Sequence, residues 1–278
     1  MSKPTAITRF APSPTGELHL GHAYSALFSE KAARDAGGRF LLRIEDIDRT
    51  RCKPGFEVAL LEILAWLGIS WDEQPRRQSD HLEDYQATLV SLAERDLVYP
   101  CFCTRKDIQA AGNAPHGPDG PIYPGTCRGL SATEVEDRKA SGLAFALRLK
   151  TDEAVRQAGP LSWCDADQGR QEAEPQVFGD VVLARKDVPT SYHLSVCHDD
   201  ALQGVTLVTR GLDLFEATHV HRLIQALMDW PQPHYHHHRL LTDETGRRFA
   251  KRDRSLTLRS LRESGRTAAS IRSELGFD

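Results

Sequence analysis

The N-terminal part of the chain alternates two short apolar runs with one helical stretch. The run at residues 7–10 ends in APSPTG, whose prolines and glycine cannot continue a strand, and residues 17–36 then show helical spacing of apolar side chains. Gly37 and Gly38 end that helix, and the compact apolar run RFLLRIED follows, as in a buried parallel strand. The pattern predicts a β-α-β unit and therefore an α/β fold.

The later segments continue this pattern. Residues 55–68 and 79–97 have the spacing of amphipathic helices, and from Tyr99 to Leu130 the chain is rich in Cys, Pro and Gly, which we interpret as an insertion. We expect strands in 143–150, 204–211 and 234–238, a strand followed by a helix in 180–200, a helix in 215–230, a turn at 243–246 and helices at the C-terminus.

Composition limits the classes of function. With 278 residues, 40% of them hydrophobic, the chain can bury a substantial core. No run approaches the roughly 18 to 20 apolar residues of a membrane span, and the N-terminus lacks the apolar centre of a signal peptide. We therefore expect a cytoplasmic protein without membrane contact. We also expect a monomer. The net charge of −4 argues against nonspecific coating of nucleic acid, so any RNA contact must be local.

Two histidines lie near the start of the first predicted helix, in the sequence HLGH. His19 and His22 are three residues apart and share a helix face, where backbone N–H groups and the helix dipole favour anions. Two imidazoles there can bind a triphosphate, and Gly21 between them lets a flat purine ring approach the backbone. A pair of surface histidines on an ordinary helix is the alternative.

Three further motifs accompany HLGH in order along the chain: RFAPSPTG at the start, RIEDIDRT after the second strand, and RRFAKRDRS near the end. Together the four motifs resemble the glutamyl-tRNA synthetase family, a class I aminoacyl-tRNA synthetase family. The resemblance implies a Rossmann-type core that makes an aminoacyl-adenylate from ATP, with Mg²⁺. It also implies catalytic and ATP-binding roles for His19, Gly21, His22 and Lys251. RFAKR departs from the KMSKS pattern at Arg248 and Ala250, whereas Lys251 keeps the second lysine.

The resemblance also assigns an amino-acid pocket. A pocket for glutamate needs a guanidinium for the side-chain carboxylate and an acid for the ammonium group. The resemblance implies that Glu45 binds the α-ammonium group, that Arg210 reaches the substrate carboxylate, and that Tyr192 closes one side. The remaining substrate-binding residues that it implies are Arg9, Phe10, Ala11, Pro12 and Ser13.

Three other positions, Val196, Asp199 and Asp200, follow Tyr192 in the sequence. At Val196 the family commonly has an asparagine, so this pocket differs slightly. Asp199 and Asp200 match an acidic pair of the family, and we interpret them as structural, for example as helix caps.

A cysteine cluster lies in the insertion. Cys101, Cys103 and Cys127 lie in a loop with little core of its own, to which a tetrahedral zinc ion would add stability. Resemblance to the shortened relatives of glutamyl-tRNA synthetase implies Tyr123 as the fourth ligand, and His116 is the alternative. Reduced, partly buried thiols would be the explanation without metal.

A run of histidines at 234 and 236–238 also suggests a metal site. We interpret these histidines as structural, because neighbours on a strand point to opposite faces and we expect no acidic or cysteine partner nearby.

By this resemblance the chain divides into the first half of a Rossmann-type catalytic domain (1–98), a zinc-binding insertion (99–135), the second half (136–235), and a KMSKS-like loop with C-terminal helices (236–278). We expect no anticodon-binding domain. The shortened relatives imply transfer of activated L-glutamate to the queuosine base of tRNA(Asp). The alternatives are a minimal glutamyl-tRNA synthetase that charges a tRNA 3′ end, a glutaminyl-type enzyme, and a non-catalytic RNA-binding paralogue.

Overall fold

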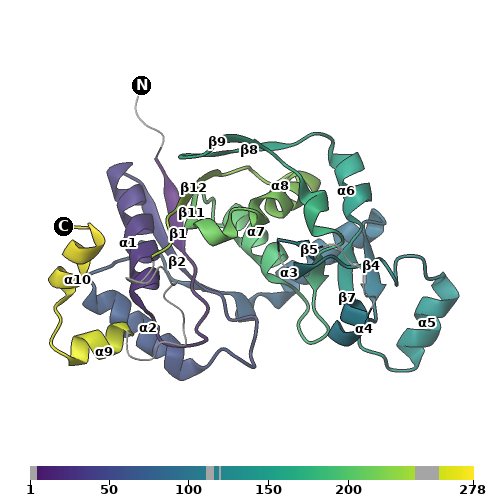
Figure 1. The fold of residues 1–278 in the computed structure, drawn as a ribbon, viewed down its shortest axis with the longest axis horizontal. Coiled ribbons are helices and arrows are strands. Elements are labelled where there is room, and N and C mark those ends of the chain that lie inside the picture. Colours follow the sequence, from purple (N-terminus) through teal and green to yellow (C-terminus); the bar gives the residue numbers. More distant parts are fainter. Residues whose placement is uncertain (1–4, 111–115, 119, 242–256) are drawn as a thin grey trace.

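The computed structural model describes residues 5–110, 116–118, 120–241 and 257–278. Its centre is a set of parallel strands that includes the predicted β-α-β unit (Figure 1). Strand β1 (Ile7–Phe10) pairs with β2 (Arg39–Ile44), and β2 pairs with β3 (Arg76–Arg77). Strand β11 (Leu207–Gly211) pairs in parallel with β12 (His234–His238).

These two groups of strands meet between β1 and β11. The backbone N–H of Thr206 donates to the carbonyl of Ile7 at 3.0 Å, and the hydroxyls of Ser29 and Thr209 lie 2.6 Å apart. With β1 beside β11, the strands of these two groups lie in the order β3-β2-β1-β11-β12, which is the arrangement of a doubly wound sheet with its switch point between β1 and β11. Ligands bind such sheets at the carboxyl ends of the strands beside the switch point, which here are the ends of β1 and β11.

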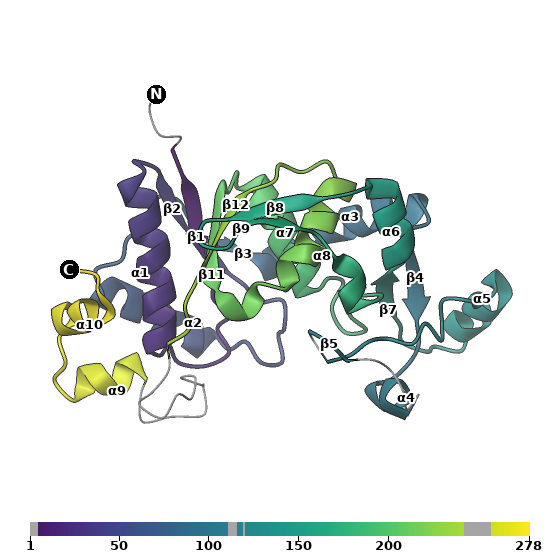
Figure 2. The same ribbon diagram turned by 45° about the horizontal axis from the view of Figure 1, so that its top comes forward.

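Helices cover this sheet (Figure 2). They are α1 (Leu20–Asp35), α2 (Pro54–Trp66), α3 (Leu82–Glu94), α7 (Tyr192–Leu202) and α8 (Ala217–Leu227). At the far end of the chain, α9 (Leu258–Glu263) and α10 (Ala268–Leu275) lie on the outer side of α1, where Ile271 and Phe277 join the same buried core as Leu27. The three-residue and four-residue 3-10 helices are Gln78–Asp80, Leu212–Leu214 and Pro175–Phe178.

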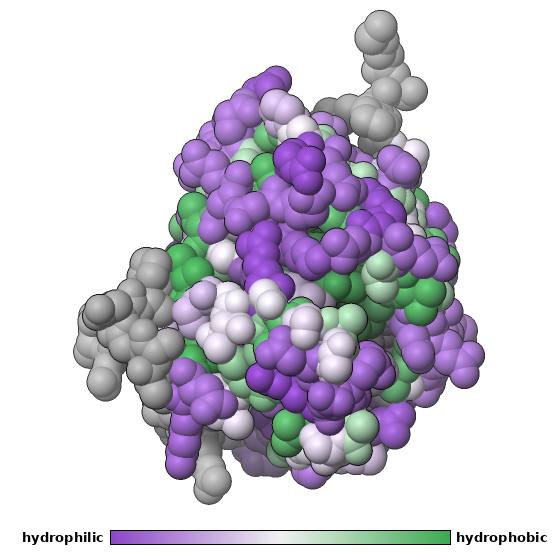
Figure 3. Space-filling view, turned by 90° about the vertical axis from the view of Figure 1, so that its right-hand side faces the viewer, coloured by the Kyte–Doolittle hydropathy of each residue, from purple (hydrophilic) through white to green (hydrophobic). Residues whose placement is uncertain are grey.

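A second, antiparallel sheet lies on the other side of α3 and α7. Its strand order is β10 (Val182–Ala184), β7 (Ala146–Leu149) and β4 (Val98–Cys101). Around it lie α4 (Arg105–Ala110), β5 (His116–Gly117), β6 (Gly120–Pro121), α5 (Ala132–Ala140) and α6 (Thr151–Ala158). Figure 3 shows this end of the molecule, where hydrophilic side chains surround smaller hydrophobic patches.

The predicted strands and helices of the described residues are confirmed, but some elements were missed. Helix α5 buries no residue, so it has no apolar stripe to reveal it, although Ser131 and Glu134 form a capping box at its start. The hairpin of β8 (Ser162–Asp165) and β9 (Gly169–Glu172) extends the central sheet by pairing with β12. Within the described ranges, every helix is too short or too polar to span a lipid bilayer.

Candidate functional site

The two histidines of HLGH lie at the start of α1, as predicted. His19 is the N-cap residue, and its Nδ1 accepts a hydrogen bond from the N–H of Gly21 at 3.1 Å. The Nδ1 of His22 accepts from the backbone N–H of His19, also at 3.1 Å, and the two ring centroids are 3.8 Å apart. Because each Nδ1 is an acceptor, each neutral imidazole carries its proton on Nε2 and can donate it. Both N–H donors belong to the positive end of the helix.

Gly21 packs directly against the first of these rings. A Cβ at position 21 would lie 3.0 Å from Cε1 and 3.1 Å from Nδ1 of His19. A side chain here would require the His19 ring to shift by a few tenths of an ångström, which is a reason for glycine in addition to the approach of a purine ring. On the other side, Thr257 pairs with His19 in an antiparallel bridge, and Leu258 donates to Leu18 at 2.8 Å. Lys251 and the turn predicted at 243–246 lie outside the described residues.

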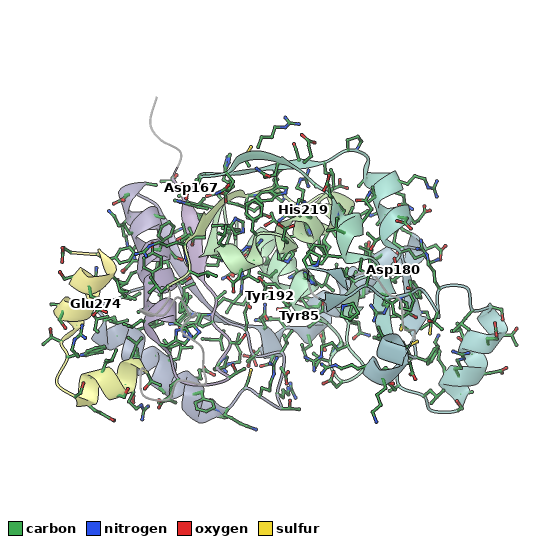
Figure 4. All side chains as sticks on the ribbon, in the orientation of Figure 1. Tyr85, Asp167, Asp180, Tyr192, His219 and Glu274 are labelled. Carbon is green, nitrogen blue, oxygen red and sulfur yellow. The ribbon has the colours of Figure 1, made fainter. Side chains whose placement is uncertain are left out.

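A small cavity of about 160 Å³ opens at the carboxyl ends of β1 and β11. Of the residues predicted to bind glutamate, Arg9, Phe10, Ala11, Glu45, Tyr192 and Arg210 line it, together with Val196. Ser13 lines a neighbouring cavity of about 120 Å³, which shares Glu45 and Tyr192 with the first. Pro12 lines neither cavity, but its carbonyl accepts a hydrogen bond from Glu45 N–H at 3.0 Å. Figure 4 shows Tyr192 in the middle of the molecule, near the start of α7.

Arg9 is held by a buried acid that the sequence did not reveal as its partner. Its Nε and Nη2 donate to the two carboxylate oxygens of Asp200 at 2.8 and 3.2 Å. Arg43, which is fully buried, donates to the same carboxylate at 2.8 Å. Although burial alone raises the pKa of Asp200, the charges of Arg9 and Arg43 outweigh it and lower the pKa. The charge of Arg9 is thus compensated within the protein.

The interpretation of Asp199 and Asp200 as helix caps is wrong, although both are structural. Asp199 accepts hydrogen bonds from Arg76 and Gln78 at 2.9 Å and from the hydroxyl of Tyr85 at 2.9 Å. Both acids lie inside α7 and connect it to the first half of the chain. Tyr85, labelled in Figure 4, belongs to α3.

Arg210, in contrast, contacts only neutral groups among the described residues. Its Nε donates to Nε2 of His237 at 3.0 Å, its Nη1 to Nδ1 of His221 at 3.0 Å, and its Nη2 to the hydroxyl of Thr218 at 2.6 Å. The Tyr192 hydroxyl is 3.5 Å from Nη1. No described carboxylate lies within ion-pair distance of this guanidinium, so among the described residues the cavity contains one buried cation without an acidic partner.

Glu45 supplies the complementary group in the same cavity. It is 8% exposed, and its Oε1 makes no hydrogen bond among the described residues; the nearest cation, Nε of Arg43, is 3.6 Å away. Burial raises the pKa of Glu45 to about 7, against the opposing charges of Arg43 and Arg9. A buried carboxylate oxygen without a partner is costly, and a ligand with an N–H donor would satisfy it.

The predicted cysteine cluster is assembled in the insertion. The sulfurs of Cys101, Cys103 and Cys127 lie within 4.8 Å of one another, and those of Cys103 and Cys127 are 3.6 Å apart. The Tyr123 hydroxyl is 3.6 Å from the sulfur of Cys103 and accepts the backbone N–H of Cys127 at 2.8 Å. Zinc–sulfur bonds of about 2.3 Å at tetrahedral angles place sulfurs roughly 3.8 Å apart, so these donors fit a zinc ion.

The histidine run on β12 is structural, but the expectation that no acid lies nearby is wrong. The hairpin β8–β9, which was not predicted, brings Asp165 to Nδ1 of His237 at 2.8 Å and Asp167 to His236 at 3.3 Å. His238 contacts the hydroxyl of Ser25 at 3.1 Å. The described residues contain no group of potential metal ligands here, only the one in the insertion.

Comparisons with known proteins agree with this architecture. The model of the family described as tRNA synthetases class I (E and Q), catalytic domain, matches residues 5–275. A Glutamyl-Q tRNA(Asp) synthetase of Rhodobacter capsulatus is 51% identical over 98% of this chain and 100% of its own length. One of Nitratidesulfovibrio vulgaris is 41% identical over 95% of this chain and 83% of its own length.

A solved structure supports the same assignment. The crystal structure of a glutamate tRNA ligase from Elizabethkingia meningosepticum superposes with a TM-score of 0.75 and 28% identity, covering 90% of this chain and 52% of that one. The chain therefore belongs to the class I tRNA synthetases for glutamate and glutamine and, within them, to the glutamyl-Q tRNA(Asp) synthetase family.

Proposed function

We propose that this enzyme activates L-glutamate with ATP and transfers the glutamyl group to the queuosine base of tRNA(Asp). The observation that carries the first half is the cavity that Arg210 and Glu45 share, in which, among the described residues, the guanidinium has no acidic partner and a carboxylate oxygen accepts no hydrogen bond. Glutamate presents the complementary charges, a side-chain carboxylate for Arg210 and an α-ammonium group for Glu45. The acceptor is inferred from the name of the relatives described above.

Activation joins the amino acid to the nucleotide. An oxygen of the α-carboxylate attacks the α-phosphorus of ATP, the bond to pyrophosphate breaks, and glutamyl-adenylate forms. His19 and His22 would donate their Nε2–H groups to phosphate oxygens at the start of α1, and Lys251 would contact the departing pyrophosphate. Mg²⁺ bound with ATP would supply further positive charge. In the second step a nucleophilic group of the queuosine base attacks the acyl carbon, and AMP leaves.

We infer that one structural zinc ion is bound by Cys101, Cys103 and Cys127, with Tyr123 as the fourth ligand. The described part of the insertion has a small core of its own around Tyr99, so metal ligation would add much of its stability. The side chain of His116, the alternative ligand, lies outside the described residues.

Transfer of labelled glutamate tests the proposed function. The purified enzyme is incubated with ATP and three acceptors, namely tRNA(Asp) with queuosine, tRNA(Asp) without it, and tRNA(Glu). We expect label only on the queuosine-containing tRNA. Label on tRNA(Glu) would instead indicate a minimal glutamyl-tRNA synthetase, and the absence of both label and glutamate-dependent ATP–pyrophosphate exchange would contradict activation itself.

A further inference from the structure

Two buried histidines, His221 on α8 and His237 on β12, hold the guanidinium of Arg210. Both are less than 4% exposed, and both accept a hydrogen bond from Arg210 at 3.0 Å. The resemblance to known synthetases assigned neither of them a role. Their arrangement bears on how the pocket selects its amino acid.

The hydrogen bonds determine the protonation of both rings. Arginine has only N–H donors, so Nε2 of His237 and Nδ1 of His221 must be unprotonated acceptors. His237 then carries its proton on Nδ1 and donates it to Asp165 at 2.8 Å. His221 carries its proton on Nε2 and donates it to Nδ1 of His193 at 3.1 Å. Burial lowers the pKa of both rings, and the adjacent charge of Arg210 lowers it further.

Because the acceptors around Arg210 are neutral, they hold its guanidinium in place without cancelling its charge. Asp200 fixes Arg9 but also cancels its charge, whereas the imidazoles and the hydroxyl of Thr218 fix Arg210 and leave its charge in the cavity. Of the five N–H groups of a guanidinium, these contacts and the longer one to Tyr192 occupy four, so one N–H on Nη2 has no partner among the described residues.

We propose that His221 and His237 are positioning residues for substrate selection. As neutral imidazoles they hold the plane of the Arg210 guanidinium and preserve its charge for the side-chain carboxylate of the amino acid, with Asp165 fixing the tautomer of His237. This inference rests on the proposed activation of glutamate and extends it to the residues behind the binding group. An arginine fixed before binding loses less conformational freedom when the carboxylate arrives.

The test uses pairs of variants that remove or keep the accepting atom. His221→Leu and His237→Leu remove it. His221→Asn places an oxygen near the position of Nδ1, and His237→Gln places one near Nε2. Glutamate-dependent ATP–pyrophosphate exchange of the full chain gives kcat and the KM values for glutamate and ATP. His219→Gln is the matched control, because His219, labelled in Figure 4, is buried on the same helix as His221 but accepts a hydrogen bond from the backbone N–H of Glu174.

We expect each leucine variant to raise the KM for glutamate about tenfold or more, with the KM for ATP nearly unchanged. The isosteric variants should recover most of that loss, and the preference for glutamate over glutamine should fall in the leucine variants and return in the isosteric ones. The control should keep the KM of the unmodified enzyme. A glutamate KM in the leucine variants equal to that of the control would overturn the inference.

Loss of activity in the unmodified enzyme and misfolding of a variant have different meanings. If the unmodified enzyme shows no glutamate-dependent exchange, the proposed function fails, and this inference with it. If a leucine variant does not fold, His221→Asn is compared with His221→Gln, whose oxygen lies one bond further out. Equal glutamate KM values for those two variants would also contradict a positioning role, because only one of them returns an acceptor to the place of Nδ1.

Discussion

Arg9 and Asp200 form a two-point ion pair inside the protein, with contacts of 2.8 and 3.2 Å and side chains that are 5% and 8% exposed. Arg43 donates to the same carboxylate, and its Nε also lies 3.6 Å from Glu45 and 3.9 Å from Asp199, so the buried guanidinium groups share several acids. This pair joins β1 to α7, two elements of the opposite halves of the chain.

Asp200→Asn should therefore destabilise the fold. Removing one partner of a buried ion pair leaves an uncompensated charge, and we expect the free energy of unfolding to fall by about 3–5 kcal/mol. Urea denaturation measures the change. Asp35→Asn is the control, since its pair with Lys31 is exposed and should cost less than about 1 kcal/mol. Similar losses in both variants would contradict the role of Asp200.

Glu45→Gln separates binding from stability. Loss of the carboxylate removes the partner of the substrate ammonium group, and we expect kcat/KM for glutamate to fall by roughly two orders of magnitude. The folded protein should be at least as stable as before, because burial disfavours the charged form of Glu45. Pyrophosphate exchange and thermal unfolding provide the two readouts. An unchanged kcat/KM would contradict the binding of the substrate ammonium group by Glu45.

The same residue predicts a pH dependence. Burial raises the pKa of Glu45 to about 7, so the carboxyl group is largely protonated at pH 6 and cannot form an ion pair with the ammonium group. The KM for glutamate should fall as the pH rises from 6 to 8. The contribution of this group to the free energy of unfolding also decreases as the pH rises from its ordinary pKa of 4.5 to about 7, because only the folded form holds the proton there, so binding improves while stability falls. Both trends should be absent in Glu45→Gln.

Gly21→Ala tests the packing at the start of α1. The new methyl group would lie 3.0 Å from the His19 ring and force it to shift by a few tenths of an ångström, so we expect the KM for ATP to rise by about tenfold. Gly55→Ala in α2 is the matched control, because nothing lies within 4 Å of its new Cβ and alanine favours a helix. Equal KM values for ATP in the two variants would argue against a role of the His19 ring in binding the nucleotide.

Cys103→Ser tests the zinc site. Metal analysis of the purified enzyme should find about one zinc per chain, and the variant should lose most of it and unfold at a lower temperature. Cys164→Ser removes an exposed thiol outside the cluster and should leave the zinc content unchanged. Retention of full zinc content in Cys103→Ser would show that the metal is held elsewhere.

Sequence periodicity was sufficient for the elements that bury an apolar face. The unit of β1, α1 and β2 was predicted because its apolar side chains recur at strand and helix spacing. The same reasoning could not find α5, whose side chains are all exposed or half-buried, or the hairpin β8–β9, whose second strand is polar. Such elements are recognised by local caps and turns, and the capping box at Ser131 was the signal available.

The sequence motifs predicted which residues form the candidate site, but not which groups those residues contact. Glu45 and Arg210 lie at strand ends in the sequence, but the partners that define their chemistry come from distant segments. Asp200 is 191 positions from Arg9, and Asp165 is 72 positions from His237. No periodicity links residues so far apart, so the contrast between a compensated Arg9 and an uncompensated Arg210 required the folded structure.

The junction between β1 and β11 also affects how the protein is made. Ile7 meets its partner Thr206 across 199 positions, so the second edge of β1 has no strand to pair with until most of the chain has left the ribosome. At ordinary rates of synthesis this takes roughly 10 to 40 s. During that interval the nascent sheet exposes an open edge, which favours pairing with other chains, and the yield of native enzyme will depend on how well the cell shields it.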